Sequence, residues 1–285
     1  METIRITGVP EHFNYPWQQM VKDQPFLEDQ VELVWENEPR GSGAMNSAIR
    51  TGATDLAIIL TESFLKDKVE GNSGKIIGYH VKSPLVWGIH VPSASEVHRP
   101  KDLENAPFLV SRMGSGSHLM TYLLAKKEGW DTKSLNFDIV SNLEGAINSF
   151  KDKKTKGFLW EKFTTKPLVD DGHFRRVGEI PTPWPCFVIV ASEKMLNENK
   201  GLLKKIQKEI YRTNKLLMED KQSFVLPISV AYKLDQKDIQ EWMSQTNWAT
   251  DGEVPDKDVI TTLDALLNLG LIDKRLAPDE IIEKL

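Results

Sequence analysis

The chain has 285 residues, enough for one large domain or two of average size, and its 40% hydrophobic and 27% charged residues are typical of a globular protein. Its 36 basic and 41 acidic residues give a net charge of −5 without a basic block, which argues against nucleic acid or an anionic membrane as a partner. The single cysteine, Cys186, excludes an intrachain disulfide, and no stretch approaches the roughly 20 apolar residues that span a bilayer.

Strands and helices alternate over the first 70 residues. Apolar segments predict strands at 4–9, 31–35 and 56–60, and helices are predicted from about residue 16, over 43–50 and after residue 63. The run at 56–60 is apolar throughout, which suits a strand buried on both faces. This βαβαβα order predicts a parallel sheet covered by helices.

The alternation then breaks and restarts. Segments 76–80 and 85–90 are both strand-like with no helix between them, which indicates a crossover between two domains. Further strands are predicted at 108–110, 137–140, 157–160, 177–180 and, as a second crossing strand, 187–190. Helices are predicted at 117–128, 143–151, 202–217, 223–234, 236–244, 256–269 and 279–285.

These elements predict a discontinuous α/β plan with two lobes. The first lobe comprises 1–84 plus 187–285, and the second, inserted lobe comprises 85–186. Ligands of open α/β sheets lie at the carboxyl ends of the strands, so we expect that edge of each lobe to face a cleft between them. Hinges are expected near 82–85 and 185–187.

A Gly/Ser loop at 111–118, SRMGSGSH, separates a predicted strand from a predicted helix, and a near twin lies at 41–43. Such a loop exposes unpaired N–H groups at the positive end of a helix, which favours an anionic or carbonyl oxygen. The alternative is an ordinary βα turn with a serine cap. Two similar loops in one chain favour a two-sided ligand site.

Side chains beside these loops supply candidate ligand contacts. Arg112 could bind a carboxylate, sulfonate or phosphate in a bidentate manner, or pair with a neighbouring acid. Glu62 and Glu161, one in each lobe, would suit a ligand amine or ring N–H, or else cap helices. Trp160 and Trp184 could stack on a flat ligand or pack in the core. The candidate ligand-binding residues are His12, Asn14, Arg40, Gly41, Ser42, Gly43, Thr61, Glu62, Arg112, Ser115, Gly116, Ser117, His118, Trp160, Glu161 and Trp184.

The familiar enzyme motifs are missing. The six histidines lack the spacing of a zinc protease motif, and neither glycine loop fits G-x-S-x-G. Asn46 and Leu119 occupy the last position of G-x-G-x-x-G. We therefore predict no catalytic residue, no metal and no cofactor.

Six stretches carry a resemblance to a known fold: WENEPRGSGAM, DLAIILTE, SPLVWGIH, SRMGSGSHLM, FLWEKFTTKP and PTPWP, within 35–185. The chain resembles type II periplasmic-binding proteins near the sulfonate, nitrate, taurine and thiamine-pyrimidine binders. More narrowly, it resembles bacterial and fungal proteins that carry this fold without an obvious secretion signal. The resemblance implies two lobes, each a mixed, mostly parallel sheet flanked by helices, with two crossing strands as the hinge.

The resemblance implies a solute-binding protein of the ABC-transporter type that captures a small polar or anionic metabolite, including heterocycles, in the cleft. One alternative is a lyase or synthase on the same fold, as in the menaquinone or thiamine pathways, with Glu62 or Glu161 as acid or base. A second is a cytosolic ligand sensor. Beyond the small molecule, the expected partner is an ABC permease or a cytosolic effector. With a strand following Met1 and no signal peptide, we expect a cytoplasmic location, or a periplasmic or lipid-anchored one if a leader was removed.

Overall fold

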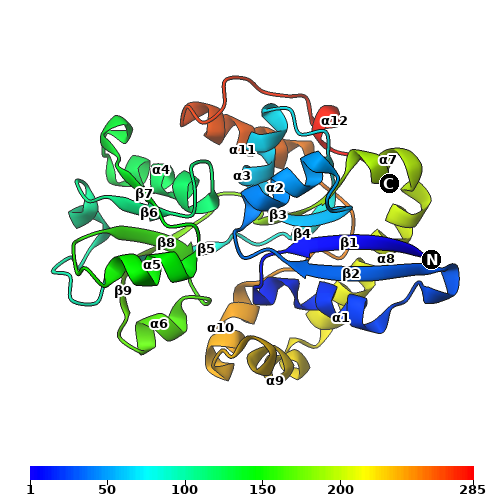
Figure 1. The fold of residues 1–285 in the computed structure, drawn as a ribbon, viewed down its shortest axis with the longest axis horizontal. Coiled ribbons are helices and arrows are strands. Elements are labelled where there is room, and N and C mark those ends of the chain that lie inside the picture. Colours follow the sequence, from blue (N-terminus) through cyan, green and yellow to red (C-terminus); the bar gives the residue numbers. More distant parts are fainter. The chain divides into compact units, whose positions relative to one another are not determined.

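The computed structural model describes all of residues 1–285 and divides the chain into two compact units (Figure 1). Unit 1 comprises Met1–Ser83 and Trp184–Leu285, and unit 2 comprises Pro84–Pro183. The boundaries therefore follow residues 83 and 183, whereas the sequence analysis placed them after residues 84 and 186. Trp184 consequently belongs to unit 1.

Unit 1 is built on a five-stranded sheet in the order β2-β1-β3-β10-β4. Its strands are β1 (Glu2–Gly8), β2 (Val31–Asn37), β3 (Leu56–Leu60), β4 (Lys75–Val81) and β10 (Phe187–Ala191). Strands β2, β1 and β3 pair in parallel, and β10 pairs antiparallel with both β3 and β4. All five residues of β3 are buried, as its unbroken apolar sequence predicts for a strand covered on both faces.

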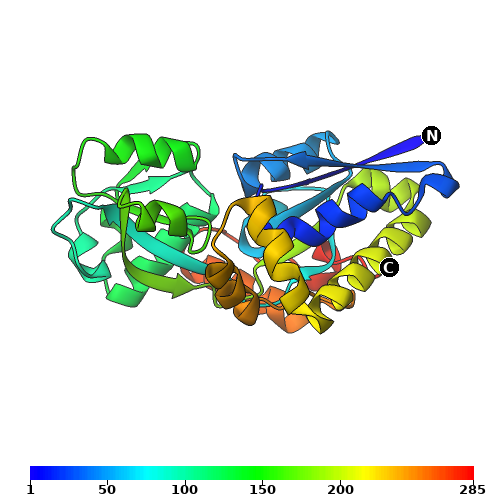
Figure 2. The same ribbon diagram turned by 90° about the horizontal axis from the view of Figure 1, so that it is seen from below.

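Helices cover both faces of this sheet. Helix α2 (Ser42–Thr51) packs on β1 and β3. Helix α3 (Thr61–Val69) packs on α2 and on α11 (Asp256–Asn268). On the other face, α1 (Tyr15–Asp23) packs on β2 and on α8 (Lys200–Glu219) (Figures 1 and 2). The remaining helices of unit 1 are α7 (Glu193–Glu198), α9 (Lys221–Tyr232), α10 (Gln236–Gln245) and α12 (Pro278–Ile281). No helix of the protein combines the length and apolar character needed to cross a membrane.

Unit 2 contains a second five-stranded sheet, in the order β7-β6-β8-β5-β9. Its strands are β5 (Val86–Pro92), β6 (Phe108–Val110), β7 (Phe137–Ile139), β8 (Gly157–Glu161) and β9 (Phe174–Pro181), and its helices are α4 (Gly116–Glu128), α5 (Leu143–Phe150) and α6 (Lys166–Asp170). Here β5 is the antiparallel strand, between β8 and β9. Leu109, Phe150, Phe158 and Phe174 form one core cluster.

The two sheets are therefore both mixed and mostly parallel, which confirms the predicted α/β fold class. In each sheet the one strand that runs antiparallel to the others, β10 or β5, is the strand that enters from the other sheet. Strand β5 enters the second sheet at Val86 after β4 has left the first at Val81, and β10 returns at Phe187 after β9 has ended at Pro181. Both connectors, 82–85 and 182–186, thus run from the carboxyl edge of one parallel sheet to the carboxyl edge of the other.

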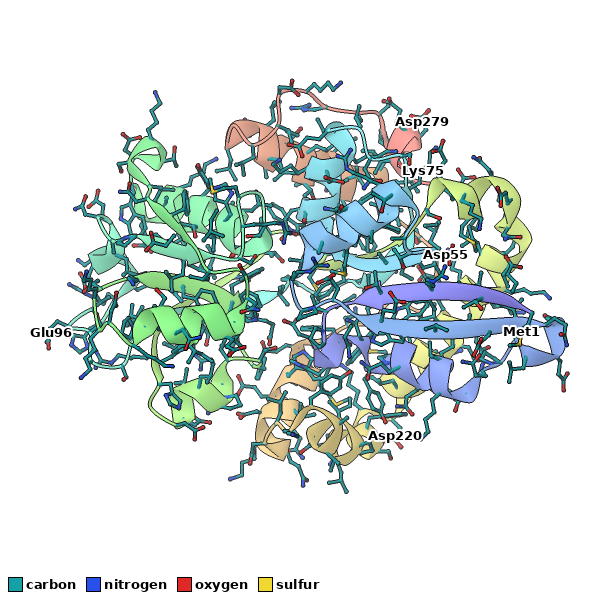
Figure 3. The ribbon with its side chains drawn as sticks, in the orientation of Figure 1. Met1, Asp55, Lys75, Glu96, Asp220 and Asp279 are labelled. Atoms are coloured by element: carbon teal, nitrogen blue, oxygen red, sulfur yellow. The ribbon has the colours of Figure 1, made fainter.

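The predicted helix at 279–285 is wrong beyond Ile281. There the chain becomes extended, Ile282 forms a parallel bridge with Ile76, and Glu283 N donates to Ile76 O at 2.8 Å. Lys75 Nζ donates to the carbonyl of Asp279 at 2.8 Å, near the end of the chain (Figure 3). Pairing with the edge strand β4 satisfies backbone groups that another helical turn would have satisfied internally.

Side chains cover the rest of the edge of β4. The hydroxyl of Tyr211 on α8 donates to Tyr79 O at 3.1 Å, and Gln207 Nε2 donates to Ile77 O. This close approach requires glycine at position 78, because a Cβ there would lie 1.9 Å from the Tyr211 hydroxyl oxygen.

We expect Gly78→Ala to lower the free energy of unfolding by about 1–3 kcal/mol, the usual cost of overpacking, as measured by urea denaturation. The matched control is Gly201→Ala at the start of α8, where a Cβ meets nothing within 4 Å. That change should be neutral or stabilise by about 0.5–1 kcal/mol. Tyr211→Phe should reduce the cost of Gly78→Ala, and an unchanged cost would show that the hydroxyl is not the obstacle.

Candidate functional site

The carboxyl end of β3 holds the second connector. Thr61, the first residue of α3, donates its backbone N–H to Cys186 O at 2.9 Å and its hydroxyl to Pro185 O at 2.6 Å. The side chain of Thr61 is buried, and both the backbone N–H and the hydroxyl of this residue donate hydrogen bonds. The structure therefore gives Thr61 a role in positioning the connector.

Glu62 follows in the first turn of α3 and is fully enclosed. Its Oε2 accepts a hydrogen bond from the indole Nε1 of Trp184 at 2.7 Å, and its Oε1 has no hydrogen-bond partner. Burial raises the pKa of Glu62 to about 7, although the Trp184 hydrogen bond opposes that rise. The structure thus brings two predicted site residues together as a buried carboxyl–indole pair in unit 1.

The glycine loop before α2 is a backbone turn with one buried hydroxyl. Gly41 has φ +79° and precedes α2, and Ser42 Oγ accepts a hydrogen bond from Leu60 N at 3.3 Å. Gly43 is half-buried in the first turn. Arg40 is exposed and pairs with Glu38 in a bidentate manner, at 2.6 and 2.8 Å. Within this loop, Ser42 bonds directly to the last residue of β3.

His12 and Asn14 lie in the turn after β1 and are buried. The His12 ring meets Trp242 edge to face at 4.2 Å between centroids, and burial lowers the pKa of His12 to about 3. Asn14 Nδ2 donates to Val9 O at 2.8 Å, while its Oδ1 has no partner. His12 is therefore a neutral member of an aromatic cluster.

Two tryptophans of this cluster were missed by the sequence analysis. Trp248 Nε1 donates to Phe13 O at 3.0 Å, and its ring meets that of Trp242 edge to face at 5.1 Å. His80 Nε2 also bonds Phe13 O, at 2.8 Å. Trp242 lies in α10 and Trp248 follows that helix, in a region where only helical periodicity was visible, so no local signal linked them to the turn after the first strand.

In unit 2, the loop after β6 is a capped turn whose hydroxyls bond within the loop. Ser115 is the N-cap of α4, and its Oγ accepts from His118 N at 3.4 Å. Ser117 Oγ lies 3.0 Å from Ser115 Oγ and accepts from Ser111 N at 3.3 Å. The serines are buried, and they organise the first turn of the helix.

The other loop residues differ in exposure. His118 Nδ1 accepts from Gly114 N at 3.0 Å, which places the hydrogen of the neutral ring on Nε2, and the ring meets Phe137 at 4.6 Å. Gly116 is the buried first residue of α4, and Arg112 is half-buried. The loop therefore combines local capping with a nearby guanidinium.

The second carboxyl, Glu161, ends β8. Its Oε2 accepts from the backbone N–H groups of Phe163 at 3.0 Å and Thr164 at 2.6 Å. Burial raises the pKa of Glu161 to about 7, against the lowering effect of these bonds. Trp160 is half-buried and stacks on Phe158 at 5.3 Å, so at least one face of its indole packs on the core. Nowhere do three or more His, Cys, Asp or Glu side chains form a group suited to a metal ion.

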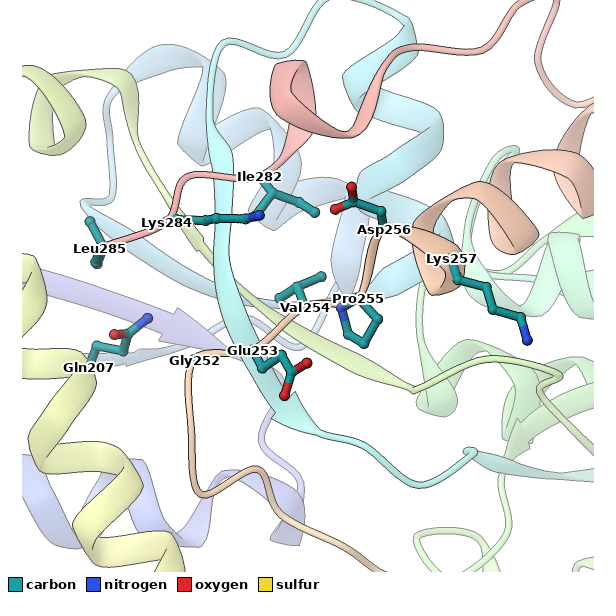
Figure 4. Close-up of a pocket in the computed structure, with 10 residues that line it drawn as sticks. All are labelled: Gln207, Gly252, Glu253, Val254, Pro255, Asp256, Lys257, Ile282, Lys284 and Leu285. Carbon is teal, nitrogen blue, oxygen red and sulfur yellow. The ribbon is translucent and has the colours of Figure 1, made fainter.

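A pocket of about 780 Å³ lies elsewhere in unit 1 (Figure 4). It lies along the outer edge of β4 and is bounded by Gln207, the segment 252–257, Ile282, Lys284 and Leu285. None of the predicted site residues lines it. It lies where two irregular segments cover the edge strand, apart from the strand-end carboxyls.

Solved structures define the class of fold. The alkanesulfonate-binding protein SsuA of Xanthomonas axonopodis pv. citri, bound to MOPS, has a TM-score of 0.83 at 15% identity, covering 100% of this chain and 99% of the other. The periplasmic nitrate-binding protein NrtA of Synechocystis has a TM-score of 0.71 at 13% identity, covering 99% and 86%. The chain has the type II periplasmic-binding-protein fold, and the resemblance predicted from the sequence is confirmed.

A narrower similarity comes from one family. The model of Ca3427-like periplasmic-binding proteins matches residues 87–180. The Candida albicans CA3427 gene product, which defines a family with this generic fold, has a TM-score of 0.88 at 25% identity, covering 100% of this chain and 97% of the other. No curated protein matches the chain.

The raised pKa of Glu62 predicts a pH-dependent stability. Between its ordinary value of 4.5 and about 7, the folded protein holds a proton that the unfolded chain has lost, so stability falls as pH rises. Relative to Glu62→Gln, the wild type should lose about 2–3 kcal/mol of unfolding free energy from pH 5 to pH 8. Denaturation at both pH values measures this, and parallel profiles would contradict a buried, perturbed carboxyl.

Proposed function

We propose that this protein binds a small polar solute at the carboxyl edges of its two sheets. The fold and its sulfonate- and nitrate-binding neighbours support solute binding in general. The observation that carries the proposal is Glu62, a buried carboxyl with one oxygen unpartnered at the carboxyl edge of unit 1. In unit 2 the corresponding edge offers the loop of Arg112 and Ser115.

The proposed capture involves bending of the connectors 82–85 and 182–186. Hydrogen bonds within each unit brace these segments. In unit 1, Cys186 N donates to Ser83 O at 3.2 Å, and in unit 2 Leu85 and Thr182 exchange two bonds of 3.0 and 2.9 Å. Each pair ties one connector to the other at its own end, which suits a hinge of two strands.

The same proposal includes a protein partner that recognises the ligand-bound form. An ABC permease would recognise it in transport, and a cytosolic effector would do so in sensing. Affinity capture with and without a stabilising ligand discriminates the two, since only the first should retain a membrane protein.

A ligand library screened by thermal shift should reveal stabilising compounds, because a ligand that binds only the folded state raises its stability. Arg112→Ala combined with Ser115→Ala should abolish the shift for those compounds. A full response of the double variant would contradict the unit 2 contacts.

Ser115→Ala alone removes an N-cap, which costs about 1 kcal/mol. Ser192→Ala is the matched control, because Ser192 Oγ caps α7 by accepting from Met195 N at 3.4 Å, the same distance as in α4. That variant should lose similar stability and keep the full ligand response.

The raised pKa values of Glu62 and Glu161 favour a second candidate, a lyase or synthase that uses one carboxyl as acid or base. Turnover of a bound compound that is lost in Glu62→Gln or Glu161→Gln, while binding persists, would support it. Binding without turnover supports the solute-binding function.

A further inference from the structure

The unpartnered oxygen of Glu62 identifies the chemistry that this edge of unit 1 lacks. The side chain is 0% exposed, Oε2 is bonded to Trp184, and Oε1 has no donor. Buried polar atoms without a partner are few in folded proteins, and each requires an explanation. The proposed solute-binding function provides one such explanation, because a polar group of the bound ligand would pair with Oε1.

The hydrogen-bond donors around Glu62 favour its ionised form and oppose the burial that raises its pKa to about 7, so the carboxyl is ionised in part at neutral pH and mostly above it. The indole N–H of Trp184 donates to it, a backbone N–H contributes in the same sense, and its place in the first turn of α3 puts it at the positive end of that helix. No basic side chain pairs with it. Enclosing a carboxylate without a counter-charge is costly, and a further donor would offset that cost.

We propose that Glu62 Oε1 accepts a hydrogen bond from a nitrogen-bound hydrogen of the ligand, either an ammonium group or an N–H of an amino-substituted ring. This inference rests on the proposed solute-binding function and names the chemical class of its ligand. A bare sulfonate or nitrate presents only acceptor oxygens, which a carboxylate repels. The ligand group that meets Glu62 therefore differs from an alkanesulfonate chain or a nitrate ion.

Glu62→Gln tests this directly because Trp184 determines how the new amide is oriented. The indole N–H requires an acceptor, so the amide oxygen takes the place of Oε2 and the NH₂ group takes the place of Oε1. The substitution therefore replaces an acceptor by a donor at one position, with little change in shape. A ligand N–H that bonded Oε1 would then face another N–H.

Matched pairs of probe compounds test whether Glu62 recognises an amino group of the ligand. In each pair a methyl group replaces an amino group: taurine and propane-1-sulfonate, β-alanine and butanoate, 4-aminopyrimidine and 4-methylpyrimidine. Dissociation constants for the full chain come from calorimetry, with thermal shift at millimolar concentration as a second readout.

In the wild type we expect at least one amino member to bind at least tenfold more tightly than its methyl analogue. Glu62→Gln should remove that preference by weakening the amino member at least tenfold. The control is Glu70→Gln, which makes the same substitution beyond the other end of α3, where Glu70 pairs with Lys66 at the surface. This variant should keep the preference unchanged.

Equal binding of the two members of every pair overturns the inference and leaves solute binding intact. A preference that survives in Glu62→Gln also overturns it, because the recognising acceptor then lies elsewhere. A panel in which no amino member binds overturns it as well, and hits from the broader library then show whether the proposed function stands. If Glu62→Gln does not fold, the wild-type comparison of each pair still decides.

Discussion

The way the chain passes between its two sheets determines which edge of each sheet meets a connector. A strand that crosses from one parallel sheet leaves it at the carboxyl edge, and here it enters the other sheet at the carboxyl edge as well, running antiparallel to its neighbours. Both connectors obey this rule. The backbone N–H groups at helix starts, and the polar side chains that follow strands, are therefore gathered at the edges that the connectors join.

Glu62 shows how the proposed ligand contact and the connector share one group. One carboxyl oxygen bonds the indole of Trp184, which lies in the second connector, and the preceding residue, Thr61, holds two carbonyls of the same segment. A ligand that bonded the other oxygen would change the charge and hydrogen bonding of a group that already fixes the connector. The proposed ligand contact and the bond to the proposed hinge thus use the two carboxyl oxygens of one side chain.

Much of this arrangement could be predicted from local patterns. Apolar runs identified the strands, and two Gly/Ser loops marked helix starts at the strand ends. What the patterns could not show was how the polar atoms are used: Ser115 and Ser117 bond within their own loop, and Trp184 bonds Glu62 across 122 positions of sequence. The extended segment at Ile282 depends on an unpaired edge strand that only the assembled sheet reveals. Such contacts are set by tertiary neighbours.

The position of β10 also bears on how the protein folds during synthesis. It lies between β3 and β4, so the first sheet cannot be completed until residue 191 has been made, and its pairings join segments far apart in sequence. Unit 2 is one continuous stretch whose sheet needs nothing outside 84–183. Closing long loops slows the formation of non-local contacts. The inserted unit is thus available to fold first on the ribosome, while the unit that surrounds it in sequence waits for the strand that joins β3 to β4.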